Sequence, residues 1–441
     1  MRTYPSAGMA IPEVLLPNSR VDPTRWAVVA CDQYTSQPEY WDAARKLAGD
    51  SPSTLNLIYP EVYLSEPDPD KRIASIREHM EKYLKEGVFE SHDGMIYVER
   101  QAAGRTRKGL VTCIDLEKYD YNKGSTTLVR ATEGTILERI PPRVRIRKGA
   151  PLELPHILIL IDDPDDTVIG AVSRHKATLR KLYDFELMQK SGHLCGYLVN
   201  DQQMEKEVAG ALDKLASPEA YCKRYGLPSG TPVLLFAVGD GNHSLATAKA
   251  IWEDKKKDGA PMDSLARWAM VELVNLHDTA LVFEPIHRVL FHIAEGRDLI
   301  KEMIAHYPGK TITTTAVAST EEMKKLVTTP VKGVHRIGMI TDKGRSVIEV
   351  KEPSANLAVA TLQQFLDPFV KSKGAAEIDY VHGTEPVDTL GRKPGNVGLF
   401  LPAMDKYDLF KSVILDGVLP RKTFSMGEAE EKRFYMECRK L

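Results

Sequence analysis

The sequence predicts a mixed α/β (α+β) protein with more than one domain. At 441 residues the chain is longer than a single hydrophobic core usually supports. Short apolar runs typical of strands alternate with segments in which apolar residues recur at helical spacing. We expect an N-terminal α/β region over residues 1–295 and a C-terminal α/β domain over residues 296–441, in which the helices and strands are shorter.

The first elements predicted are a strand, two helices and a hairpin. The stretch VDPTRWAVVACD (21–32) is strand-like, and PEYWDAARKLAG (38–49) has helical composition. Apolar residues recur every third or fourth position in residues 69–87, which predicts an amphipathic helix with one face in the core. Residues 95–116 alternate in polarity around a loop at Gly104, so we expect two paired strands there.

An arginine-rich stretch over residues 128–150 allows two interpretations. In the first, it is a solvated turn followed by an edge strand, because Pro141 and Pro142 forbid a regular helix. In the second, Arg143 and its neighbours form a phosphate-facing cluster near Glu133, since planar guanidinium groups suit phosphate.

The stretch VLLFAVGDGNHSLATAKAIWEDKKK (233–257) predicts a buried strand, a polar turn and a helix. Such a turn exposes backbone N–H groups at the positive end of a helix, where a phosphate binds well. Gly239 and Gly241 would allow close approach, Asp240 would hold magnesium, and His243 would contact phosphate or transfer a proton. The alternative is a plain turn in which Asn242 or Ser244 caps the helix.

Three further places carry candidate side chains. Asp32 follows the strand AVVAC, where an acid often projects into a cleft. His287 and Arg288 lie side by side after Pro285, an arrangement that suits an anion or equally a packed histidine beside a surface arginine. Lys422 belongs to a polar stretch near the end of the chain, which on its own indicates only a polar tail.

Composition excludes several classes of function. The formal net charge is −2, so no overall field would attract nucleic acid or an anionic membrane. We find no secretory signal and no apolar stretch of membrane-spanning length, and we expect a cytoplasmic protein. Five scattered cysteines without a CxxC pair argue against disulfides and structural zinc. The common motifs of nucleotide-binding and hydrolase folds are also absent.

In this order, the stretches resemble a bacterial and archaeal family known as domain of unknown function 1015. Its PPYD, RxGL, HExT, DGHHR, PxHR and PPKST elements each have a counterpart, and together they cover nearly the whole chain. The corresponding stretches here are Ala30–Tyr34, Arg107–Leu110, Thr132–Thr135 with Arg143, Asp240–Ser244, Pro285–Arg288 and Leu419–Phe424.

The family's DGHHR loop is similar to the phosphate-holding loop of the ParB, sulfiredoxin and free-serine-kinase superfamily. This resemblance implies a ParB/sulfiredoxin-like nucleotide-binding core, with the C-terminal domain returning a basic tail to the site. Asn242 and Ser244 stand where the family has histidine and arginine, so the loop lacks a charged donor to phosphate. Arg143, Arg288 or Lys422 would then supply that charge, or the ligand differs from the usual one.

The leading functional hypothesis is a nucleotide-dependent phosphotransferase that acts on a small, serine-like hydroxyl substrate. It would bind ATP, ADP or CTP with Mg²⁺ at Gly239–Ser244, with His287 and Arg288 nearby, and use Asp32 or Glu133 as general base. One alternative is a regulator that binds a nucleotide or metabolite without turnover. Another is a hydrolase of small phosphoesters. The sequence does not indicate the oligomeric state.

Overall fold

The chain divides into two compact units, which consist of residues 1–281 with 426–441 and of residues 282–425. The computed structural model describes every residue except Ile136, Leu137 and Arg139. The sequence predicts a single boundary at residue 295, whereas the chain leaves the first unit after Leu281 and returns to it at Met426. The last residues of the chain therefore belong to the first unit.

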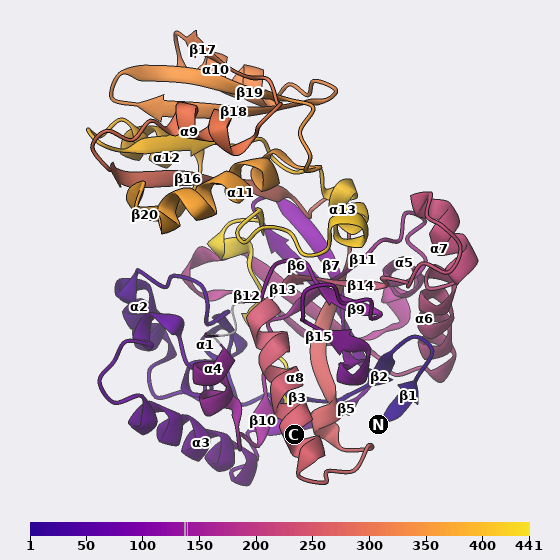
Figure 1. The fold of residues 1–441 in the computed structure, drawn as a ribbon. Coiled ribbons are helices and arrows are strands. Elements are labelled where there is room, and N and C mark those ends of the chain that lie inside the picture. The colour runs from indigo at the N-terminus through magenta and orange to yellow at the C-terminus, as the bar shows by residue number, and fades with distance from the viewer. Residues whose placement is uncertain (136–137, 139) are drawn as a thin grey trace. The chain divides into compact units, whose positions relative to one another are not determined.

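The first unit is built around an eleven-stranded sheet (Figure 1). Its main path runs in the order β12-β13-β6-β7-β15-β11-β14-β9-β8, and β1 and β2 join it through β7. The strands are β1 (Arg2–Tyr4), β2 (Met9–Ile11), β6 (Met95–Ala102), β7 (Arg105–Asp115), β8 (Tyr119–Asp120), β9 (Val129–Ala131), β11 (Leu158–Ile161), β12 (Arg180–Glu186), β13 (His193–Val199), β14 (Phe236–Asp240) and β15 (Trp268–Asn275).

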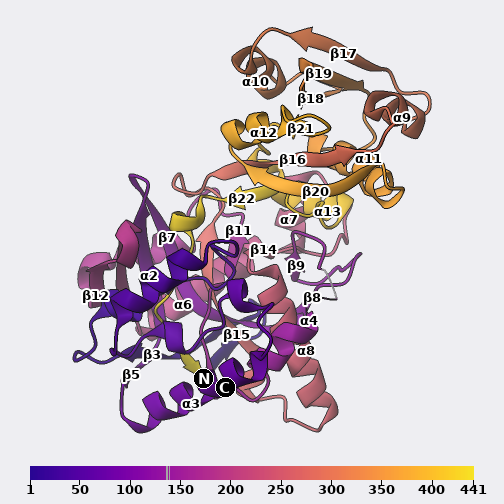
Figure 2. The same cartoon turned by 90° about the vertical axis from the view of Figure 1, so that its left-hand side faces the viewer.

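Helices cover both faces of this sheet. The helices are α1 (Pro23–Trp26), α2 (Pro38–Ala48), α3 (Pro69–Lys85), α4 (Ile140–Arg147), α5 (Ile169–Ser173), α6 (Gln202–Leu215), α7 (Pro218–Tyr225) and α8 (Asn242–Lys257). Residues of α1, α2 and α3 share one apolar core with the end of the chain, and residues of α5, α6 and α8 share the other. Figure 2 shows the same unit turned by 90°.

Three two-stranded sheets complete the first unit. They pair β3 (Glu13–Pro17) with β5 (Phe89–Asp93), β23 (Phe434–Tyr435) with β4 (Val28–Val29), and β24 (Arg439–Lys440) with β10 (Leu152–Glu153). In two of the three pairs the final residues of the chain form one strand. The C-terminal segment is thus part of the architecture and lies against the face that carries α1 to α3.

The second unit is a seven-stranded sheet with helices on both faces. Its apolar clusters place α9 and α11 on one face and α10 and α12 on the other. Its elements are β16 (Phe283–Ile293), α9 (Leu299–His306), β17 (Ile312–Val317), α10 (Thr320–Thr328), β18 (Val334–Thr341), β19 (Gly344–Lys351), α11 (Ala358–Lys371), β20 (Ala375–His382), α12 (Thr384–Gly391), β21 (Val397–Phe400), α13 (Leu409–Asp416) and β22 (Phe424–Met426).

The mixed α/β class is confirmed, and so are several of the predicted elements. The helix predicted over residues 69–87 is α3, whose buried side chains include Ile73 and Met80. The hairpin predicted around Gly104 is formed by β6 and β7. Helix α4 corrects a prediction, because Pro141 and Pro142 start a helix instead of preventing one. Both prolines lie in its first turn, where the missing N–H costs no intrahelical hydrogen bond.

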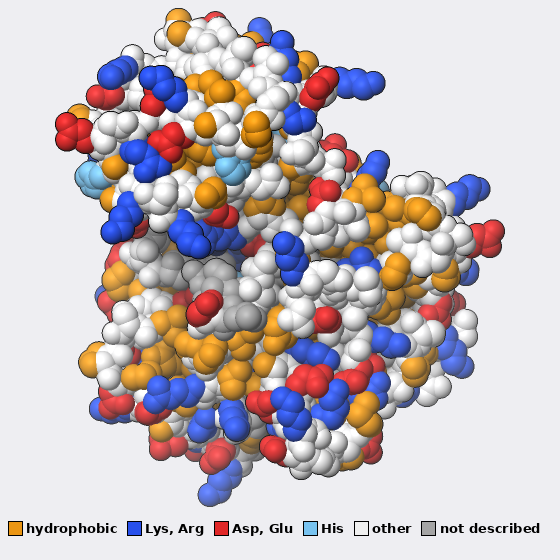
Figure 3. Space-filling view, viewed as in Figure 1, with side chains coloured by type: hydrophobic (Ala, Val, Ile, Leu, Met, Phe, Trp, Pro, Cys, Tyr) orange, Lys and Arg blue, Asp and Glu red, His pale blue; other side chains and the backbone are white. Residues whose placement is uncertain are grey.

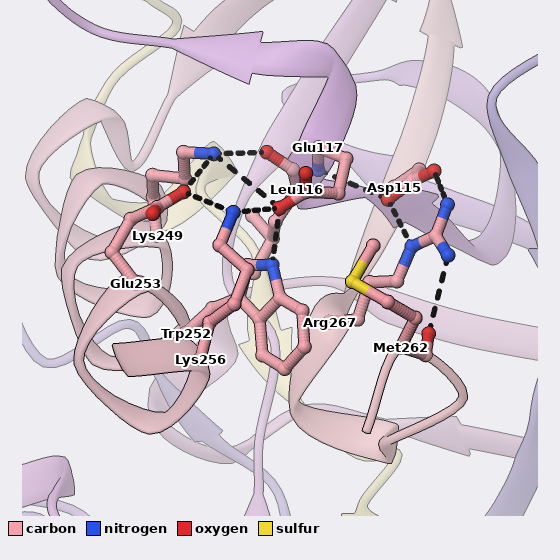
Figure 4. A network of polar contacts seen from close by, with 9 residues as sticks. All are labelled: Asp115, Leu116, Glu117, Lys249, Trp252, Glu253, Lys256, Met262 and Arg267. Carbon is pink, nitrogen blue, oxygen red and sulfur yellow. Dashed lines mark hydrogen bonds and ion pairs between the residues drawn. The ribbon is translucent and has the colours of Figure 1, made fainter. Parts of the chain in front are cut away.

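A partly buried polar network holds α8 from its middle to its C-terminal end (Figure 4). Glu117 accepts hydrogen bonds from Trp252 Nε1 and from Lys256 Nζ, both at 2.6 Å. Lys249 Nζ donates to the carbonyl oxygen of Leu116 at 2.8 Å. These contacts join the helix to the segment after β7, and so they fix where its N-terminus lies.

Charges of both signs are interspersed on the surface in the view of Figure 3. Among the described residues, no helix is both long and apolar enough to cross a membrane.

Candidate functional site

The turn between β14 and α8 depends on Gly241. Its φ of +77° lies in the left-handed region, and a Cβ added there would meet Cα of Ile157 at 3.1 Å. Gly239 has no such φ, but a Cβ there would lie 2.9 Å from Cγ of Leu160. One glycine therefore permits the turn, and the other permits close packing.

The expected capping role of Asn242 or Ser244 is wrong. Gly241 is the N-cap residue, and it has no side chain that could cap α8. Asn242 is instead the first residue of the helix, and its Nδ2 donates to the carbonyl oxygen of Val238 at 3.3 Å. The first turn also contains no acid, so the positive end of α8 is not neutralised by its own side chains.

Glu133 and Asp240 follow the ends of two neighbouring parallel strands. Strands β9 and β14 are parallel, and Ala131 pairs with Val238, so each acid lies two residues beyond a paired position. Thr132 Oγ1 donates to the carbonyl oxygen of Val238 at 2.6 Å. This bond holds the two segments together beyond the last paired residues of β9 and β14. Two carboxylates are thus placed beside the turn.

Lys432 brings a positive charge to the end of β14. Its Nζ lies 3.2 Å from Oδ2 of Asp240, and the residue is 7% exposed. Lys432 also acts on Asp32, together with His156 and Gln33. Burial would raise the pKa of Asp32, but these neighbours outweigh burial and hold the pKa below its usual value. Asp32 is therefore ionised at neutral pH.

His156 lies beside Asp32 and is itself contacted by Tyr435. His156 Nε2 lies 4.0 Å from Oδ2 of Asp32, and its Nδ1 is 2.9 Å from Tyr435 Oη. Tyr435 Oη also accepts the backbone N–H of Cys31 at 3.2 Å. Burial raises the pKa of Tyr435 strongly, so the phenol keeps its proton and remains a neutral hydrogen-bonding partner of Nδ1.

Arg143 joins the same cluster through Glu61. It lies on α4 and forms an ion pair with Glu61, whose backbone N–H donates to the carbonyl oxygen of Cys31 at 2.7 Å. Burial raises the pKa of Glu61, although Arg143 acts in the opposite direction. Asp32 and Arg143, chosen from the sequence, are thus connected by an acid that the sequence did not indicate.

The remaining predicted residues lie in the second unit. His287 accepts the backbone N–H of Leu401 at Nδ1 (3.1 Å) and stacks on Phe400. Burial, followed by the charge of Arg288, lowers the pKa of His287 to about 4. Arg288 is fully buried and donates to carbonyl oxygens of Ile286 and Arg421.

Lys422 is exposed and also belongs to the second unit, with a φ of +56°. The structure therefore brings Asp32, Glu133, Arg143 and Asp240 together within the first unit, while His287, Arg288 and Lys422 are positioned by contacts within the second.

Sequence reasoning missed Glu61, His156, Lys432 and Tyr435. Lys432 and Tyr435 lie in KRFYMEC (432–438), where Phe, Tyr, Met and Cys are the only signal that this part of the chain is buried. For Glu61 and His156 we see no such signal.

Among the described residues, no group of three or more His, Cys, Asp or Glu side chains is arranged to hold a metal ion. Asp240 offers one carboxylate, which is already paired with Lys432. An all-protein magnesium site does not fit this geometry. A magnesium ion that brings most of its ligands from phosphates and water needs only one or two carboxylates, and Asp240 in the turn can supply one of them.

The fold and the site define an α/β protein with a glycine-dependent strand–turn–helix unit beside a buried polar cluster. The chain belongs to the family described as protein of unknown function (DUF1015), whose model matches residues 15–369. The match contains all the residues chosen from the sequence except Lys422, and it ends before the stretch Leu419–Phe424 and before Lys432 and Tyr435. No curated protein matches the chain.

Solved structures with partial likeness include a conserved hypothetical protein from Pyrococcus furiosus. It is 11% identical, with a TM-score of 0.36 over 74% of this chain and 90% of that one. A variant of free serine kinase in complex with ADP is 9% identical, with a TM-score of 0.40 over 74% of this chain and 91% of that one. Because both likenesses are this low, the function has to be inferred from the chain's own residues.

Proposed function

We propose that the first unit binds a nucleotide and transfers a phosphoryl group to a small hydroxyl substrate, of which serine is the model. The observation that carries this proposal is the placement of Lys432, Asp240 and Asp32 beside the N-terminus of α8. Phosphoryl transfer depends mostly on positioning and on neutralising charge, and this cluster offers both.

The phosphate end of the nucleotide would lie against the turn Gly239–Ser244. Backbone N–H groups and the helix dipole attract it there, and His243 lies in the first turn of α8. The charge missing from Asn242 and Ser244 would come from Lys432, which forms an ion pair with Asp240 of this turn. Arg143 would add a second cation if it exchanged Glu61 for a phosphate oxygen.

Asp32 would accept the proton of the substrate hydroxyl. Its depressed pKa makes it a weak base, which suits a reaction in which the proton leaves late. His156 is a positioning residue, because it faces Asp32 and is held in turn by Tyr435. Glu133, which follows the end of β9, is the second carboxylate proposed for this role.

Magnesium would accompany the nucleotide, and Asp240 is the carboxylate that we assign to it. Lys432 competes for this carboxylate, so magnesium affinity without nucleotide should be low. Adding magnesium alone should leave the melting temperature unchanged, while magnesium with nucleotide should raise it.

The test measures nucleotide binding and turnover separately. ATP, ADP or CTP with magnesium should raise the melting temperature of the full chain, and Gly241→Val should abolish the rise, because Val can neither adopt this φ nor avoid Ile157. Asp32→Asn should keep the nucleotide shift and lose phosphorylated product when serine and other small alcohols are supplied. Gly259→Ala, at a left-handed glycine with open space around it, is the matched control.

Each outcome separates the candidate functions. Absence of a shift with any nucleotide would overturn the proposal. A shift without product would favour a binding regulator, and phosphate release without an acceptor would favour a hydrolase.

A further inference from the structure

Two buried arginines face each other on neighbouring strands of the first unit. Arg100 on β6 pairs directly with Arg107 on β7, so both side chains project from the same face of the sheet. They are 2% and 7% exposed. Like charges directly opposite each other in a sheet repel, and burial removes the water that would screen them.

Backbone carbonyl groups are their main partners. Arg100 donates to the carbonyl oxygens of Gln101 at 2.7 Å and Glu430 at 2.5 Å, and Arg107 donates to that of Glu431 at 3.2 Å. Carbonyl oxygens satisfy N–H groups but do not neutralise a charge. Both arginines therefore remain uncompensated by these bonds.

Donor atoms are left over on both side chains. Within the described part of the chain, Nε of Arg100 and both Nε and Nη2 of Arg107 are buried without a hydrogen-bond partner. Glu272 is the acid nearest to Arg107, with 3.6 Å between its Oε1 and Nε of the arginine, too far for a hydrogen bond. Its other oxygen, Oε2, already accepts from Arg433.

The local charges do not balance. Arg100, Arg105, Arg107 and Arg433 contribute four positive charges, whereas Glu272, Glu431 and Glu437 contribute three negative ones. Tyr183, which donates to Glu437, keeps its proton because burial raises its pKa strongly. Burial, followed by the charge of Arg107, lowers the pKa of Arg100 to about 9, so it still carries its charge at neutral pH.

We propose that Arg100 and Arg107 form a binding site for the carboxylate of a small acid. A guanidinium pair with free N–H groups matches the two oxygens of a carboxylate, and one negative charge restores the balance. A phosphate dianion would exceed that charge and would lie near Glu272. The site therefore favours a monoanion.

The end of the chain covers this site. Residues 427–433 cross the arginine pair, because Glu430 and Glu431 accept its hydrogen bonds, and Lys432 then reaches Asp240. A ligand must displace this segment to enter. Residues 427–433 thus contact both the carboxylate site and the cluster around Asp240. Carboxylate binding does not depend on phosphoryl transfer.

The test titrates the full chain with sodium acetate against sodium chloride at constant ionic strength. Acetate should raise the melting temperature in a saturable way beyond the effect of chloride, and Arg107→Gln should remove the difference. Arg100→Lys keeps the charge but loses the planar guanidinium group. This variant should show a smaller acetate effect on the melting temperature than the wild type. Arg130→Gln is the matched control, because Arg130 is equally buried and bonded to carbonyl groups but lies on β9.

Three results would overturn the proposal. They are the absence of a saturable acetate effect in the wild type, an undiminished effect in Arg107→Gln, and a larger Arg107-dependent effect with inorganic phosphate than with acetate. If the variants do not fold, a crystal structure of the wild type grown in acetate decides, since density must contact Nε of Arg100 and Nη2 of Arg107. Gly241→Val should keep the acetate effect, which separates this site from the nucleotide turn.

Discussion

Lys432 is the residue on which the candidate site depends most. It neutralises Asp240 directly and lowers the pKa of Asp32, and it is nearly buried where an unpaired charge is costly. An ion pair of this kind contributes little compared with an apolar pair, but removing one partner alone leaves an uncompensated charge. Whether a mutation at this ion pair stabilises or destabilises the protein therefore depends on whether it removes one charged partner or both.

Replacing Lys432 should destabilise the protein mainly through Asp240. We expect Lys432→Met to reduce the free energy of unfolding by roughly 1–3 kcal/mol, because Asp240 is partly exposed. The double variant Lys432→Met with Asp240→Asn should lose less than the sum of the two single losses. Urea unfolding measures this coupling. Lys257→Met, at an exposed ion pair, should change stability by less than about 0.5 kcal/mol, and additive single losses would contradict the prediction.

His287 should make stability depend on pH. Its pKa of about 4 in the folded state lies below the value of about 6.5 in the unfolded chain, so the unfolded chain binds more protons between these values. The contribution of His287 to the free energy of unfolding is thus fully present above about pH 6.5, and up to roughly 3 kcal/mol is lost as the pH drops towards 4. Hydrogen exchange of β16 amides between pH 4 and 7.5 should show this loss.

The control for this prediction is His287→Asn, because the Asn oxygen can still accept the Leu401 N–H but does not titrate. The stability of this variant should depend less on pH between 4 and 7.5 than that of the wild type. His175→Asn, at an exposed histidine, should keep the wild-type profile. An unchanged slope in His287→Asn would show that another group causes the pH dependence.

At the scale of elements, α8 is held in place by contacts of its C-terminal half, which is the end away from the candidate site. The turn at its N-terminus is short and glycine-dependent, so the contacts of Glu117 with Trp252 and Lys256 decide where the first turn of the helix points (Figure 4). Arg267 similarly bonds both oxygens of Asp115, the last residue of β7. The site therefore depends on residues far from it in the sequence.

Glu117→Gln should loosen this support. Burial acts to raise the pKa of Glu117, but its bonds with Lys256 and Trp252 outweigh burial and lower it. The stabilisation is therefore present above about pH 4.5 and is lost as the pH falls further. We expect the variant to lose roughly 0.5–1.5 kcal/mol at pH 7 and to be less sensitive to acid below pH 4.5. Glu253→Gln removes only pairs within α8, and an equal loss there would contradict the assignment.

Elements were predicted from the sequence where their signal is local. The periodicity of Ile73 to Tyr83 identifies α3, and the alternation on both sides of Gly104 identifies the β6–β7 hairpin, because each pattern reports on neighbouring residues. Helix α4 gives no such signal, because proline breaks a helix in its interior but is tolerated in the first turn, where Pro141 and Pro142 lie.

At the scale of the whole molecule, the site could be predicted only in part. Asp32 and Asp240 stand at strand ends, which is a local signal, but His156 and Lys432 reach them through pairings across most of the chain. Strand β23 lies next to β4, which is some 400 residues earlier in the sequence, and no periodic pattern encodes such a pairing. The sequence therefore suggested a basic contribution from the chain's end, but from Lys422 and not from Lys432.

The second unit is an insertion in the first, and this predicts opposite outcomes for two deletions. Phe283 and Phe424 stack with 4.0 Å between ring centroids, so the two connections run side by side. Replacing residues 283–424 by a short Gly-Ser linker should therefore leave a chain that folds. All four tryptophans lie in the first unit, so their fluorescence should keep the wild-type spectrum and unfold cooperatively in urea.

Removing only residues 426–441 should unfold the first unit, although this deletion is far smaller. Phe434, Tyr435, Met436 and Cys438 are each at most 2% exposed, and each large apolar side chain contributes roughly 1.5–3 kcal/mol when buried. Their loss, together with the Arg433 partner of Glu272, approaches the total stability of about 5–15 kcal/mol that is typical of a protein domain. A truncated chain that keeps the wild-type tryptophan spectrum and urea midpoint would show that the C-terminal segment is a dispensable tail.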